Sequence, residues 1–176
     1  MTDPIENFIY KIADYLVPIA YSTGHTPNII TTYALLLRLL ALIYIYYNNY
    51  LLFVIFWIVG QVMDCLDGQL ARKYNMTSNL GSIYDHISDF ICNITLVVIV
   101  FSKLNNLHLR IAFFCFVIII FSLSSVYNAC LREQRGDNDK FSRFLRLCWF
   151  DPGLFGCGFA NLMIIILTIT ILVINK

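Results

Sequence analysis

The chain has 176 residues, of which 59% are hydrophobic and only 13% are charged. A soluble domain of this size usually carries about 25% charged and about 45–50% apolar residues, so the composition argues against a water-soluble protein and indicates a chain surrounded by lipid. The net charge of +1 gives no polycationic signature for nucleic acid, and the six scattered cysteines form no CxxC motif that would predict a metal site or a disulfide framework.

The first predicted element is an amphipathic helix over residues 3–20 that lies along the membrane interface. Its apolar residues recur at the spacing of one helical stripe, while its charged residues lie elsewhere; the stripe comprises Ile5, Phe8, Ile9, Ile12 and Leu16. A frayed tail is the alternative. No basic region or cleavage site of a signal peptide precedes it, so we expect the first span to insert as an uncleaved anchor.

Five apolar stretches follow that are long enough to cross a bilayer, whose core of about 30 Å requires about 20 helical residues. They cover residues 29–47, 51–70, 80–102, 107–131 and 153–174. We therefore expect an all-α, multi-pass transmembrane bundle of five to six spans in a single domain, residues 1–176. Eight basic residues on one set of loops against three on the other place the N-terminus and the connections 71–80 and 132–151 in the cytosol.

Four carboxylates lie inside the second and third spans, where an aspartate at mid-helix costs about 2.5–3.5 kcal/mol on insertion scales. At about 100° per residue, Asp64 and Asp67 share one face of the second span, and Asp85 and Asp89 share one face of the third. Because these spans are antiparallel and joined by a short loop, the four acids can converge at two matched depths. Their mutual repulsion predicts bound cations, and oxygen-only ligands suit Mg²⁺ or Mn²⁺. Two such ions, about 4 Å apart, are typical of phosphoryl chemistry.

The residues around these acids complete a recognisable pattern. Gly68, Ala71 and Gly81 lie on the same faces and leave room for a ligand, and Arg72 can balance a phosphate. Residues 64–89 resemble the signature DxxDGxxARx8GxxxDxxxD of the CDP-alcohol phosphotransferase family at all eight fixed positions. Residues 26–31, Thr-Pro-Asn-Ile-Ile-Thr, resemble that family's entry to its first core span. The resemblance is good over residues 26–100 and rests on hydropathy elsewhere.

The resemblance implies an enzyme of phospholipid biosynthesis that moves a substituted phosphate from a CDP-alcohol to a hydroxyl acceptor and releases CMP. It also implies a cytosol-facing cavity among six helices, usually in a homodimer. Two Mg²⁺ or Mn²⁺ ions would grip the pyrophosphate, held by Asp64, Asp67, Asp85 and Asp89. Asp89 would also be the general base for the acceptor hydroxyl. The cytidine diphosphate would be surrounded by Asn28, Gly68, Ala71, Arg72 and Gly81.

Several readings stay open at this point. Arg132 and Arg135 would either fix the topology as positive charges on the cytosolic side or form an anion pocket for a phosphorylated acceptor. Because the loop that carries them is basic and cytosolic, we favour a CDP-diacylglycerol donor with a small polar acceptor. The Tyr84-Asp85-His86 sequence instead resembles the choline and ethanolamine branch, in which diacylglycerol is the acceptor. Arg38, inside the first span, is expected to pair with an acid or to face the cavity.

Two alternatives from other classes also follow from the sequence. A cation transporter or channel would use the same acids as an ion pathway, but the nearly pure hydrocarbon of residues 51–59 and 94–101 argues against conduction. A CDP-lipid-binding relative without turnover is suggested by a count of five core spans where the family has six.

Overall fold

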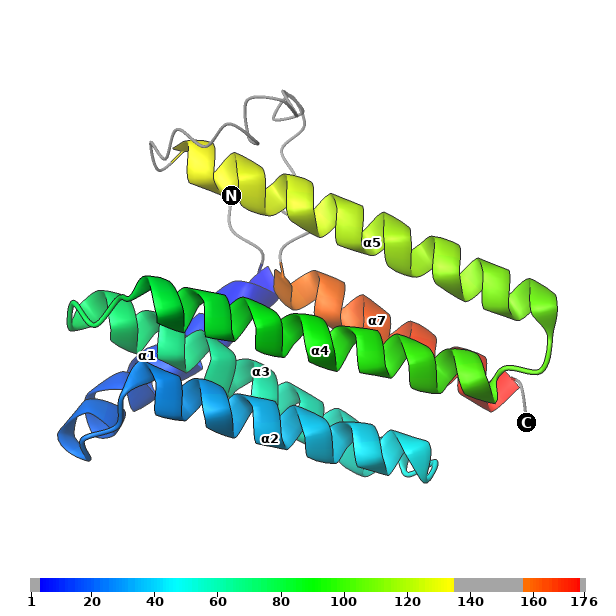
Figure 1. The fold of residues 1–176 in the computed structure, drawn as a ribbon, viewed down its shortest axis with the longest axis horizontal. Coiled ribbons are helices and arrows are strands. Elements are labelled where there is room, and N and C mark those ends of the chain that lie inside the picture. The colour runs from blue at the N-terminus through cyan, green and yellow to red at the C-terminus, as the bar shows by residue number, and fades with distance from the viewer. Residues whose placement is uncertain (1–3, 135–156, 175–176) are drawn as a thin grey trace. The chain divides into compact units, whose positions relative to one another are not determined.

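The computed structural model describes residues 4–134 and 157–174, and these are helical with no strand among them (Figure 1). The helices are α1 (Pro4–Ser22), α2 (Pro27–Tyr46), α3 (Tyr50–Lys73), α4 (Asn79–Lys103), α5 (Leu107–Gln134) and α7 (Cys157–Ile174). Three of them, α2, α3 and α4, are long and apolar enough to cross a membrane, and shorter apolar stretches occupy Leu107–Ile120 and Leu162–Ile174. The expected all-helical class is confirmed, whereas a total of five to six spans stays a prediction.

The chain divides into two compact units. One unit, Phe8–Lys103, holds most of α1 and all of α2, α3 and α4, and it contains the whole signature. The other unit comprises Met1–Asn7 and Leu104–Lys176; within it α5 contacts α7, and Phe113 and Thr168 are fully buried. The proposed site therefore belongs to the first unit.

Local sequence signals set the helix ends in the first unit. Pro27 opens α2, where its missing N–H is no loss and its fixed φ suits a helix. The side chain of Asn49 caps α3 by accepting a hydrogen bond from the backbone nitrogen of Leu52 at 3.2 Å. Ser78 Oγ accepts from the backbone nitrogen of Gly81 at 3.0 Å at the start of α4. These caps leave the faces of the helices free for packing.

Helix α2 contacts both α3 and α4, and all three are drawn in Figure 1. It approaches α3 closely at Gly60, where an added Cβ would lie 2.8 Å from Arg38 Cγ and 3.3 Å from the carbonyl oxygen of Ala34. A larger residue fits at that crossing only if the Arg38 stem or the helix backbone shifts. Helix α2 therefore supplies side chains to the two helices that carry the signature.

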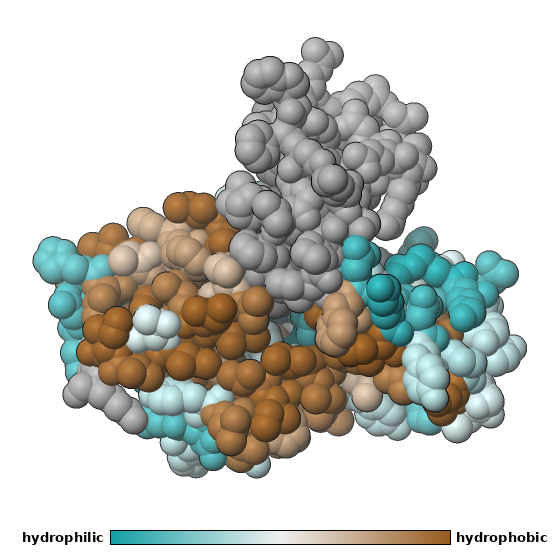
Figure 2. All heavy atoms as spheres, turned by 180° about the vertical axis from the view of Figure 1, so that it is seen from behind, coloured by the Kyte–Doolittle hydropathy of each residue, from teal (hydrophilic) through white to brown (hydrophobic). Residues whose placement is uncertain are grey.

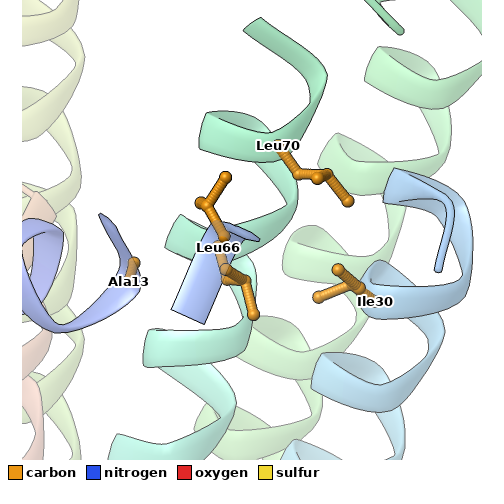
Figure 3. Close-up of a cluster of buried hydrophobic side chains, with 5 residues drawn as sticks. Ala13, Ile30, Leu66 and Leu70 are labelled. Atoms are coloured by element: carbon orange, nitrogen blue, oxygen red, sulfur yellow. The ribbon is translucent and has the colours of Figure 1, made fainter. Parts of the chain in front are cut away.

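Helix α1 is observed where the sequence predicts a helix, and it packs through residues outside the predicted apolar stripe. Small residues of α1 join a buried cluster with α2 and α3, formed by Ala13, Val17, Ile30, Leu66 and Leu70 (Figure 3). Leu16 packs against this cluster, whereas Phe8 is 65% and Ile12 38% exposed. Close helix packing selects the small side chains, and the large apolar ones face outward. An interfacial position for α1 stays a prediction.

Large apolar side chains are exposed along the three membrane-length helices, for example Leu36, Ile55 and Val98. In Figure 2 hydrophobic residues make up much of the surface that is shown. Lys103, the last residue of α4, donates hydrogen bonds to the carbonyl oxygen of Tyr46 and to Asn48 Oδ1, at 2.7 and 2.8 Å. A lipid environment accounts for this distribution, since water would not tolerate so much exposed apolar surface.

Candidate metal centre

Three of the four signature acids converge. Asp64 and Asp67 on α3 and Asp85 on α4 each offer a carboxylate oxygen, and these oxygens lie within 4.8 Å of one another. Asp67 is buried and the other two are half-buried. Asp85 Oδ1 is buried without a hydrogen-bond partner among the described residues. Three convergent carboxylate oxygens fit a hard divalent cation.

Asp67 is oriented by α2. The hydroxyl of Thr31, itself buried, donates a hydrogen bond to Asp67 Oδ2. The same hydroxyl lies 3.1 Å from the carbonyl oxygen of Pro27, one helical turn earlier. A hydrogen bond of this kind holds a ligating carboxylate in one orientation, which is the usual task of the residues behind a metal ligand.

The fourth acid, Asp89, has a different partner. Its Oδ1 forms an ion pair with Arg38 NH1, and Arg38 NH2 lies 3.4 Å from Asp64 Oδ2. Arg38 NH2 also donates to Gln61 Oε1 at 3.1 Å, and Gln61 Nε2 donates to Asp64 Oδ2 at 3.5 Å. Arg38 is only 4% exposed. The prediction that this intramembrane arginine pairs with an acid is confirmed, and it pairs with two.

The residues expected around a cytidine diphosphate lie where α2 and α4 begin and α3 ends. A Cβ added to Gly81 would lie 2.8 Å from Asn28 Oδ1 and 2.9 Å from Ser78 Oγ, so Asn28 and Gly81 are neighbours. A Cβ added to Gly68 would lie 3.2 Å from NH1 of Arg72, so these two are neighbours as well. Ala71 is half-buried on α3, and Arg72 is exposed. No described contact joins these five residues into one binding surface.

The predicted acceptor residues fall outside the described part of the chain. Arg132 belongs to α5, but its side chain is not described, and Arg135 follows the last described residue of that helix. Residues 140–150, which would have to hold part of a sixth span if the chain has one, likewise lie outside the described residues. His86 is exposed, and its Nδ1 lies 3.9 Å from Asp85 Oδ2.

The sequence reasoning missed the roles of Thr31 and Gln61. For each residue the sequence holds a pattern that could have indicated its role. Gln61 is a polar residue in an otherwise apolar run, one helical turn before Asp64. Thr31 precedes Arg38 by seven residues, which places the two on one face of α2.

The sequence profile of the CDP-alcohol phosphatidyltransferase family matches residues 24–175. An uncharacterized protein of Aquifex aeolicus is 27% identical over 89 residues, which are 51% of this chain and 45% of that protein. An archaetidylinositol phosphate synthase of Pyrococcus horikoshii is 40% identical over 68 residues, 39% of this chain and 36% of the relative. The chain thus spans less than half the length of these curated relatives. No solved structure matches.

Proposed function

Because the chain belongs to the CDP-alcohol phosphatidyltransferase family, we propose that it is a membrane enzyme that transfers a substituted phosphate from a CDP-alcohol to a hydroxyl acceptor and releases CMP. One observation carries this proposal: carboxylate oxygens of Asp64, Asp67 and Asp85 lie within 4.8 Å of one another inside the family's signature. Asp64 and Asp67 lie in the C-terminal half of α3 and Asp85 in the N-terminal half of α4. Acids on this side of membrane-length helices support a site where a lipid substrate and a water-soluble one can meet.

The carboxylates have separate tasks in this proposal. Asp64, Asp67 and Asp85 would hold a divalent ion, Mg²⁺ or Mn²⁺, which when bound supplies stabilisation for the charge on the transferring phosphate. Thr31 keeps the Asp67 carboxylate in its orientation. Asp89 would contribute to a second ion and take the proton of the acceptor hydroxyl, whose oxygen then bonds to phosphorus as the bond to CMP breaks.

The cytidine diphosphate would lie against the helix ends. Asn28 and Gly81 are at the beginnings of α2 and α4, where the positive end of the helix dipole attracts phosphate. Gly68 and Ala71 would let the ligand approach α3 closely, and Arg72 would pair with a phosphate oxygen. The distribution of basic residues between the loops supports a cytosolic position for the helix ends that would bind the cytidine diphosphate. The family resemblance supports a homodimer.

We favour CDP-diacylglycerol as the donor and a small polar alcohol, itself phosphorylated, as the acceptor. The basic residues Arg132 and Arg135 support an anionic acceptor. The similar protein of Pyrococcus horikoshii is named for a lipid that carries inositol phosphate, which supports the same class. The second candidate, transfer of phosphocholine or phosphoethanolamine to diacylglycerol, is supported by His86 beside Asp85.

Purified protein with Mg²⁺ tests the proposal when each donor is offered with each acceptor and CMP is measured. CDP-diacylglycerol with glycerol phosphate or inositol phosphate should give acceptor-dependent CMP, and CDP-choline with diacylglycerol should not. Asp64→Asn, purified in parallel, should give no CMP and so controls for contaminating enzymes. Absence of CMP from every pair would reject the proposed reaction and leave a binding protein or a cation pathway.

The acceptor class has its own test. Arg132→Gln and Arg135→Gln should raise the KM of a phosphorylated acceptor while the donor KM changes little. Lys11→Gln, which removes an exposed charge from α1, is the matched control and should change neither KM. An unchanged acceptor KM in both arginine variants would reduce these residues to topology anchors.

A further inference from the structure

The four signature acids are not equivalent in the structure. Oxygens of Asp64, Asp67 and Asp85 form one close group, and this group does not include Asp89. Asp89 is ion-paired with Arg38, whose second nitrogen also faces Asp64. The guanidinium of Arg38 therefore already neutralises part of the negative charge at Asp89 and Asp64.

Arg38 is held in the site by several contacts. Its side chain is almost fully buried, and NH1 and NH2 are engaged by Asp89, Asp64 and Gln61. Its Cγ packs where a Cβ on Gly60 would come within 2.8 Å, so the stem is enclosed by α3. A guanidinium stays charged at any accessible pH. The charge is thus a permanent part of the site.

The formal charge of the site then determines the order in which divalent ions bind. Four carboxylates and one guanidinium have a formal charge of −3, which one divalent ion brings to −1. A second ion would bring it to +1, which is unfavourable in a buried place until an anionic diphosphate arrives.

We infer that Arg38 is a positioning residue that acts as the resident cation of Asp89 and makes two divalent-ion sites unequal. The inference rests on the proposed function, since it concerns the same carboxylates. The first ion binds to Asp64, Asp67 and Asp85. The second reaches Asp89 only when the guanidinium gives up its contact, and it does so together with the phosphates of the substrate.

A purely structural role for Arg38, as a link between α2, α3 and α4, predicts a different effect of its removal. Its removal would then lower the stability of the protein without changing the relative affinities of two ions. Counting bound ions therefore separates the two roles, and activity need not be measured.

The experiment is a titration of detergent-purified protein with Mn²⁺ alone, with free Mn²⁺ followed by electron paramagnetic resonance. The unaltered protein should bind one ion, with a second at least about tenfold weaker. Arg38→Gln should tighten the second site by about tenfold or more, the size typical of changes behind a metal ligand. Arg38→Lys keeps the charge and should keep the order.

The control is Lys73→Gln, which removes an exposed positive charge from the last turn of α3. It should change the second affinity by less than about threefold, the effect expected of a screened charge. Equal affinities for two ions in the unaltered protein would overturn the inference. So would identical titrations of Arg38→Gln and Lys73→Gln.

Asp89→Asn gives a second, independent arm if Arg38→Gln does not fold. It should keep the first ion and lose the second, whereas Asp85→Asn should lose the first; loss of the first ion in Asp89→Asn would overturn the inference. Because no CDP-alcohol is present, these titrations stand apart from the CMP assay. An unaltered protein that binds ions in this order but never releases CMP would reject the proposed reaction alone.

Discussion

Removal of a single hydroxyl, Thr31→Val, tests the support of the metal centre most directly. The Thr31 hydroxyl donates to Asp67 Oδ2, and both residues are buried. Valine has almost the same shape, so packing between α2 and α3 should be preserved. The substitution removes the donor of one hydrogen bond to the Asp67 carboxylate.

Two separate routes give the expected size of the effect. A hydrogen bond to a charged group contributes about 1.5–3 kcal/mol, which corresponds to roughly 10–150-fold in an equilibrium constant. Loss of a hydrogen bond behind a metal ligand typically costs about 10–100-fold in metal affinity or activity. We therefore expect Thr31→Val to weaken the first Mn²⁺ site and to lower kcat/KM for CMP release by about 10–100-fold.

Thr95→Val is the matched control. Its hydroxyl donates to the carbonyl oxygen of Ile91 at 2.7 Å, one turn earlier on α4, just as Thr31 lies 3.1 Å from that of Pro27. The control removes the same local contact without touching a carboxylate, so Mn²⁺ affinity should change by less than about threefold. Thr31→Ser retains the hydroxyl and should recover most of the affinity.

Equal Mn²⁺ affinity in Thr31→Val and Thr95→Val would refute the reasoning, because Asp67 would then need no help from α2. A lower unfolding temperature of Thr31→Val in detergent, with unchanged ion binding, would assign the hydrogen bond to folding alone.

Three further substitutions or treatments extend these expectations. Asp89→Asn should lower kcat by at least about 10²–10⁴-fold in the CMP assay, since it removes the proposed base; near-normal turnover would remove Asp89 from the chemistry. Excess EDTA should stop CMP release and added Mg²⁺ or Mn²⁺ should restore it, whereas activity that persists in EDTA would exclude a metal mechanism. Gly60→Ala should lower stability by about 1–3 kcal/mol, measured by thermal unfolding in detergent, because its Cβ would meet Arg38 Cγ at 2.8 Å. Gly68→Ala meets only the mobile end of Arg72 and should cost less, and equal losses would contradict the close crossing at Gly60.

Much of this protein could be read from the sequence, because the relevant signals are local. Apolar runs of bilayer length predicted α2, α3 and α4 to within a few residues, with Pro27 at the start of α2. Helical periodicity predicted which acids share a face, since residues three or four apart always do. The high cost of an unpaired arginine in lipid predicted that Arg38 has an acidic partner.

The tertiary structure decided which partner each polar group has. Arg38 meets Asp89, 51 residues away, and Thr31 meets Asp67, 36 residues away. The packing of Ala13 and Val17 on α1 against Ile30, Leu66 and Leu70 has the same origin. Periodicity defines a helix face but leaves open how the helix is rotated and which neighbour it crosses. The close approach of α2 to α3 at Gly60 settles that rotation, and with it the division of four similar acids into a group of three and one held by arginine.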